Sequence, residues 1–64
     1  MMADQTGKGV LIVEDEQELR KLFAILLEME GFSVLQANDG KQGLELLEKH
    51  AAEVRLLITD LNLP

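Results

Sequence analysis

The feature that most constrains this chain is an apolar run that ends in a carboxylate. Residues 56–59 read Leu-Leu-Ile-Thr, and Asp60 follows them. A run of this kind is typical of a strand buried on both faces of a parallel sheet. An earlier run, residues 10–13, ends in the same way at Glu14 and Asp15. Sites in open α/β sheets form beyond the carboxyl ends of the strands, so we expect these three carboxylates to meet at one edge if the two strands are parallel neighbours.

Length and composition exclude several classes of protein. Sixty-four residues make at most one small domain. There is no cysteine, which excludes disulfides and thiolate metal sites. The net charge of −6 argues against nucleic-acid binding by this segment, because neutralising phosphates requires clustered Lys and Arg. No apolar run approaches the ~20 residues of a membrane span, and we expect a cytoplasmic chain that does not enter the membrane.

The hydrophobic periodicity predicts a β-α-β-α-β chain after a disordered leader at residues 1–8. The expected strands cover residues 9–13, 32–37 and 54–59, and the expected helices cover 16–30 and 40–50. The second strand contains Ser33 and Gln36, which favours an edge position. Right-handed crossovers then give an α/β fold whose parallel sheet has the strand order 2-1-3, with one helix on each face.

Local signals mark the ends of the two helices. Asp15 is a candidate N-cap of the first helix, with Glu18 in its first turn, and Asp39 with Gln42 suggests the same for the second. Gly31 stands where a glycine often ends a helix.

The apolar faces of the helices differ in width. The first helix has an arc about half its circumference wide, which predicts a second neighbour besides the sheet. The second helix has a narrow stripe. The arc comprises Leu19, Leu22, Phe23, Ile25, Leu26, Leu27 and Met29, and the stripe comprises Leu44, Leu47 and Ala51.

Crowded carboxylates disfavour each other's ionisation, and a divalent cation relieves that repulsion. Ligation by oxygen alone suits Mg²⁺ or Mn²⁺ rather than Zn²⁺. A carboxylate beside such a metal can attack phosphorus and form an aspartyl phosphate. Taken singly, each residue also has an ordinary interpretation: Asp15 as a helix cap, Glu14 as a solvated loop carboxylate and Asp60 as a turn residue.

Three segments together resemble the receiver domain of two-component response regulators. They are residues 10–16 (VLIVEDE), 38–40 (NDG) and 58–64 (ITDLNLP). The resemblance extends over residues 9–64 and implies a flavodoxin-like fold truncated to its first three strands and two helices, the N-terminal half of the family's domain.

The resemblance implies a role for each residue of the acidic site. Asp60 would be the phospho-acceptor, taking phosphate from a histidine kinase or a phosphotransfer protein. Asp15 and Asp60 would bind Mg²⁺, with Glu14 acting mainly through a metal-bound water and Asn62 through its backbone carbonyl. The Ser/Thr and Lys that contact the phosphoryl group in the family lie in its other half and match no residue here, so we expect inefficient phosphorylation.

Two other classes of function stay open. A fragment of a Mg²⁺-dependent phosphotransfer or phosphoesterase enzyme would use similar acidic strand ends, but such folds place a D-x-D motif where this chain has Asp60-Leu61-Asn62. A non-enzymatic fragment with a vestigial site would only self-associate. The open edge of the third strand and the arc of the first helix predict a homodimer or higher oligomer, with third strands paired across a two-fold axis.

Overall fold

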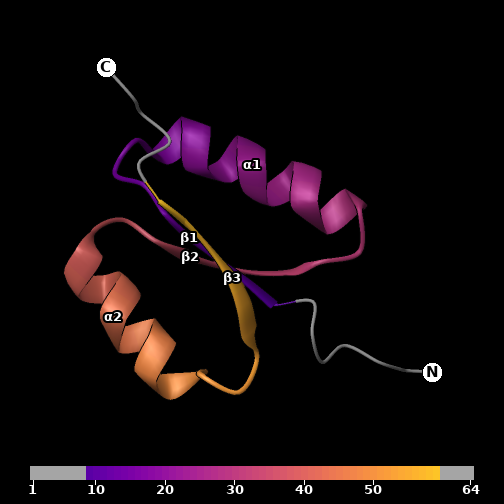
Figure 1. Ribbon diagram of the computed structural model, residues 1–64. Coiled ribbons are helices and arrows are strands. Elements are labelled where there is room, and N and C mark those ends of the chain that lie inside the picture. Colours follow the sequence, from indigo (N-terminus) through magenta and orange to yellow (C-terminus); the bar gives the residue numbers. More distant parts are fainter. Residues whose placement is uncertain (1–8, 60–64) are drawn as a thin grey trace.

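The computed structural model describes residues 9–59, which form five elements in the predicted order. These are β1 (Gly9–Val13), α1 (Gln17–Met29), β2 (Ser33–Ala37), α2 (Gly40–Lys49) and β3 (Val54–Thr59) (Figure 1). The bounds of β1 and β3 are those predicted. The leader predicted at residues 1–8 lies outside the described residues, as does the segment 60–64.

The three strands form one parallel sheet of order β2-β1-β3, which confirms the predicted topology. Val13 pairs with Ala37 on one side and with Thr59 on the other. Because all the strands run in one direction, their last residues lie at the same edge of the sheet. The segments that follow Val13 and Ala37 therefore begin side by side.

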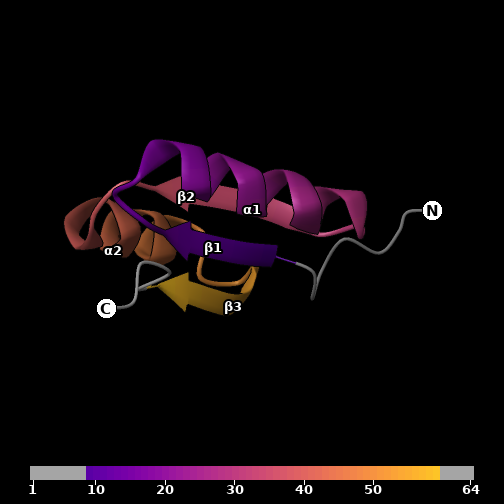
Figure 2. The same cartoon turned by 90° about the horizontal axis from the view of Figure 1, so that it is seen from above.

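Strand β1 is the centre of the core, and its residues alternate between the two faces of the sheet. Val10 and Ile12 pack with Ala24 of α1. Val13, on the other face, lies against α2 at Gly43. The helices thus cover opposite faces of the sheet, as predicted (Figures 1 and 2).

The predicted N-cap of α1 is wrong. The cap residue is Glu16 rather than Asp15, and the side chain of Glu16 makes no capping hydrogen bond. The carboxylate of Glu14 instead accepts a hydrogen bond from the backbone N–H of Glu16 at 2.9 Å. The helix therefore begins one residue later than the predicted cap implies, and Asp15 lies before it, exposed to solvent.

The other two helix-end predictions are confirmed. Asp39 caps α2 by accepting a hydrogen bond from the N–H of Gln42 at 2.8 Å. Gly31 follows the last turn of α1 with φ 96°, a left-handed conformation that favours glycine. Its N–H donates to Glu28 at 3.0 Å, and the N–H of Phe32 donates to Leu27 at 3.1 Å, the two bonds of a Schellman motif.

Both helices pack mainly on β1 and β2, so β3 is poorly covered on either face. Leu56 and Leu57 are 50% and 49% exposed, although their apolar run predicted burial. Part of the arc of α1 is also exposed to solvent, and the second neighbour predicted for it stays a prediction. Its exposed members are Leu22, Ile25, Leu26 and Met29.

The predicted stripe of α2 is only partly correct. Leu47 is half-buried, but Leu44 is 57% exposed, and Ala51 is exposed and lies beyond the end of the helix. The residue that α2 buries is Gly43, where an added Cβ would lie against the side chain of Val13. Over residues 9–59, no helix is long and apolar enough to cross a membrane.

Candidate functional site

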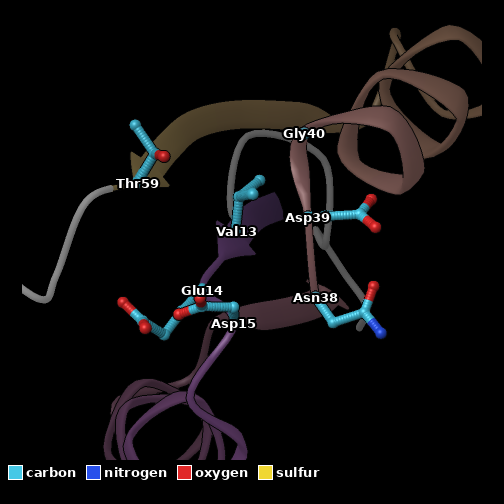
Figure 3. Close-up of a pocket in the computed structure, with 7 residues that line it drawn as sticks. All are labelled: Val13, Glu14, Asp15, Asn38, Asp39, Gly40 and Thr59. Atoms are coloured by element: carbon cyan, nitrogen blue, oxygen red, sulfur yellow. The ribbon is translucent and has the colours of Figure 1, made fainter.

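The carboxyl edge of the sheet contains a hollow of about 470 Å³. Glu14 and Asp15 reach it from the end of β1, Asn38 and Asp39 from the end of β2, and Thr59 from β3 (Figure 3). Val13 and Gly40 complete its lining. Acidic and neutral oxygen-bearing residues thus line this hollow, and no Lys or Arg is among the lining residues that the structure describes.

Glu14 is the most constrained residue of the site. It is only 4% exposed, so its interpretation as a solvated loop carboxylate is wrong. Its N–H donates to the carbonyl of Ala37 at 3.0 Å, which extends the pairing of β1 with β2. Its carboxylate accepts from the N–H of Glu16, and its carbonyl accepts from Nη1 of Arg20 at 2.8 Å. The carboxylate lies at the N-terminus of α1, where the helix dipole favours negative charge.

Asp15 lies beside Glu14 but is exposed to solvent. In Figure 3 the side chains of Asn38 and Asp39 point away from those of Glu14 and Asp15. Asp39 is also occupied as the cap of α2. Among the described residues that line the hollow, Glu14 and Asp15 therefore carry the two carboxylates that do not cap a helix.

The donor set at this edge fits a hard divalent cation. Carboxylate and hydroxyl oxygens suit Mg²⁺, which keeps several waters and needs only one or two carboxylates from the protein. The exposed carboxylate of Asp15 is accessible for direct ligation. One oxygen of Glu14 already accepts the Glu16 amide, which suits contact through a metal-bound water.

The structure brings together two of the four predicted metal ligands. The other two, Asp60 and Asn62, lie outside the described residues. Between residues 9 and 59, no group of three or more His, Cys, Asp or Glu side chains could hold a metal ion. The predicted cluster of three carboxylates needs Asp60, so it stays a prediction.

Two residues at this edge of the sheet are not predicted from the sequence. Thr59 lines the hollow from β3, and pairing Val13 with Thr59 would have been the signal for it. Arg20, on α1, donates a hydrogen bond to the carbonyl of Glu14, and no local sequence pattern predicts that contact.

Comparison with known proteins decides the family. The family model described as "Response regulator receiver domain" matches residues 10–64. The chain belongs to this family. Membership implies a part in two-component signalling, and it agrees with the parallel α/β fold and the acidic edge of the sheet.

The relatives include regulators and a sensor protein. The chain is 46% identical over 55 residues to the transcriptional regulatory protein CpxR of Escherichia coli K12, covering 86% of this chain and 22% of CpxR. It is 38% identical over 55 residues to the aerobic respiration control protein ArcA of the same strain, with the same coverage. It is 40% identical over 57 residues to the CAI-1 autoinducer sensor kinase/phosphatase CqsS of Vibrio cholerae, covering 89% of this chain and 8% of CqsS.

The chain spans about a fifth of the length of CpxR and ArcA, and less of CqsS. No solved structure matches it significantly.

Proposed function

We propose that residues 9–64 are the N-terminal half of a receiver domain whose phospho-acceptor is Asp60. Phosphate would come from a histidine kinase or a phosphotransfer protein, with Mg²⁺ as cofactor. The observation that supports this proposal is the parallel pairing of Val13 with Thr59. The residue that follows each of these two strands in the sequence is acidic, Glu14 after β1 and Asp60 after β3.

In the proposed reaction, a carboxylate oxygen of Asp60 forms a bond to phosphorus as the phosphorus–nitrogen bond of a phosphohistidine breaks. The leaving imidazole nitrogen takes the electron pair of that bond. Asp15 would bind Mg²⁺ directly, Glu14 through a water, and Asp60 and Asn62 through side-chain and carbonyl oxygens respectively. When bound, Mg²⁺ neutralises the phosphoryl oxygens. Electrostatic stabilisation of the phosphoryl group dominates such reactions.

The test is an NMR titration of the 64-residue chain with Mg²⁺ and then beryllofluoride, an analogue of the phosphoryl group. We expect shifts at Glu14, Asp15 and Asp60, and loss of the beryllofluoride response in Asp60→Asn. Asp39→Asn is the matched control, because it removes the same charge from the hollow while asparagine still caps α2. No response of the parent chain up to tens of millimolar Mg²⁺, beyond the millimolar range of weak hard-cation sites, would contradict the proposal.

We also propose that the chain self-associates through β3. This strand has an exposed apolar side chain on each face. Leu56 pairs with Val10 and so lies on the face that α1 covers, and Leu57 lines an apolar hollow with Leu44 and Leu47 of α2. A partner must therefore offer a strand edge with apolar layers above and below it. A second copy related by a two-fold axis offers both, with the two β3 strands antiparallel.

Light scattering at micromolar concentration tests this association. We expect a dimer or larger species for the parent chain, and a monomer for Leu57→Lys. A monomeric parent chain would refute the proposal.

A further inference from the structure

One cationic side chain forms a hydrogen bond to the acidic loop, which contains Glu14 and Asp15 after β1, without lining the hollow. Arg20 lies in the first turn of α1 and is half-buried. Its Nη1 donates to the carbonyl oxygen of Glu14 at 2.8 Å, and its Nε donates to Oε1 of Gln36 on β2 at 3.2 Å. The same guanidinium therefore links the loop after β1 to the edge strand of the sheet.

Arg20 also holds the other end of that loop through its backbone. Its N–H donates to the carbonyl of Glu16 at 3.0 Å, which starts the hydrogen bonding of α1. Asp15 thus lies between two carbonyls, those of Glu14 and Glu16, that are both bonded to Arg20. The bond to Glu14 is charge-assisted, so it is stronger than a bond between neutral groups.

The partners of the guanidinium separate two possible roles. Within residues 9–59 it donates to a carbonyl and to an amide side chain, and no ion pair joins it to the carboxylate of Glu14 or Asp15. A cation near a metal site repels the incoming metal, so charge alone would weaken Mg²⁺ binding. Its hydrogen bonds instead fix the orientation of the peptide unit between Glu14 and Asp15.

We propose that Arg20 is a positioning residue of the acidic site: by bonding the carbonyl of Glu14 and the side chain of Gln36, it holds Asp15 towards the hollow before a cation binds. The proposal rests on the proposed function for its ligand, Mg²⁺. Lysine cannot replace this residue, because a single ammonium lacks the planar fork that reaches two acceptors at fixed spacing.

The experiment compares Arg20→Gln, Arg20→Lys and Lys21→Gln in the 64-residue chain. Lys21 is exposed on the same turn of α1, so Lys21→Gln repeats the charge change of Arg20→Gln. The Mg²⁺ dissociation constant is measured from the amide shift of Asp15. We expect both Arg20 variants to bind roughly ten-fold more weakly, the size of effect typical of residues that orient metal ligands. Lys21→Gln should stay within about two-fold of the parent, because exposed charges are largely screened.

Amide hydrogen exchange without Mg²⁺ gives a second readout. We expect faster exchange of the Glu16 amide in both Arg20 variants, with the amides of β1 still protected, which shows that the sheet is intact. Tighter Mg²⁺ binding by Arg20→Gln with parental binding by Arg20→Lys would mean that only the charge matters, and would overturn the proposal. Unchanged exchange at Glu16 would overturn it as well. If the parent chain does not bind Mg²⁺, the proposed function fails, while exchange at Glu16 still decides whether Arg20 holds the loop.

Discussion

The close approach of α2 to β1 gives a prediction that can be worked through in free energies. A Cβ added at Gly43 would lie 2.7 Å from Cγ2 of Val13, the residue before the acidic loop. That distance is too short for two carbon atoms, and the β-branched side chain of Val13 has few alternative rotamers. Gly43→Ala therefore forces the helix and the strand apart at the edge of the sheet that carries the site.

Two effects of opposite sign decide the result. Alanine in a helix interior is more favourable than glycine by about 1 kcal/mol. Overpacking of a well-filled site costs about 1–3 kcal/mol. We therefore expect Gly43→Ala to change the free energy of unfolding by between roughly zero and 2 kcal/mol in the destabilising direction. In a Val13→Ala background the overlap disappears, so the same substitution should stabilise by up to ~1 kcal/mol.

The assay is a double-mutant cycle by urea unfolding at one fixed protein concentration, since any self-association would alter apparent stability. Gly40→Ala is the matched control, because a Cβ added there meets nothing within 4 Å. We expect a coupling energy of about 1–3 kcal/mol between positions 13 and 43. Equal effects of Gly43→Ala in the two backgrounds would refute the argument.

The same unfolding assay tests two further predictions. Asp39→Ala removes the cap of α2 and should lower the free energy of unfolding by about 1 kcal/mol. Asp15→Ala should change the free energy of unfolding by less than about 0.5 kcal/mol and should still weaken Mg²⁺ binding. A larger stability loss for Asp15→Ala would show that Asp15 has a structural role. Gly31→Ala should destabilise by about 1 kcal/mol because of its positive φ, and Gly31→Asn by less. Equal stability of parent and Gly31→Ala would contradict the observed backbone conformation.

The architecture was predictable from sequence because it depends on periodicity and on which strand is polar. Ser33 and Gln36 identified β2 as an edge strand, and the rest of the topology followed from the handedness of the crossovers. Asp39 and Gly31 were predictable because each acts on backbone groups within a few residues of itself. These are local effects, which the sequence displays directly.

The details of the acidic site were less predictable, because they depend on contacts between elements. Asp15 is a residue type that often serves as an N-cap. Here, however, the carboxylate of Glu14 accepts the hydrogen bond from the backbone N–H of Glu16. Arg20 bonds to Gln36, a residue on another strand, which no helical spacing indicates. A glycine within a helix is usually expected only to weaken that helix, whereas the missing side chain of Gly43 lets α2 approach Val13.

The central place of β1 has a consequence for the order in which the chain folds. β1 and β2 are joined through α1, so their pairing closes a short loop. Pairing of β1 with β3 joins Gly9 to Val54, near opposite ends of the described segment. Closing that longer loop costs more chain entropy than closing the loop between β1 and β2, and contacts so distant in sequence slow folding. Until β3 arrives, the most apolar strand has one unpaired edge, and during synthesis that edge is exposed until nearly the last of these residues has emerged.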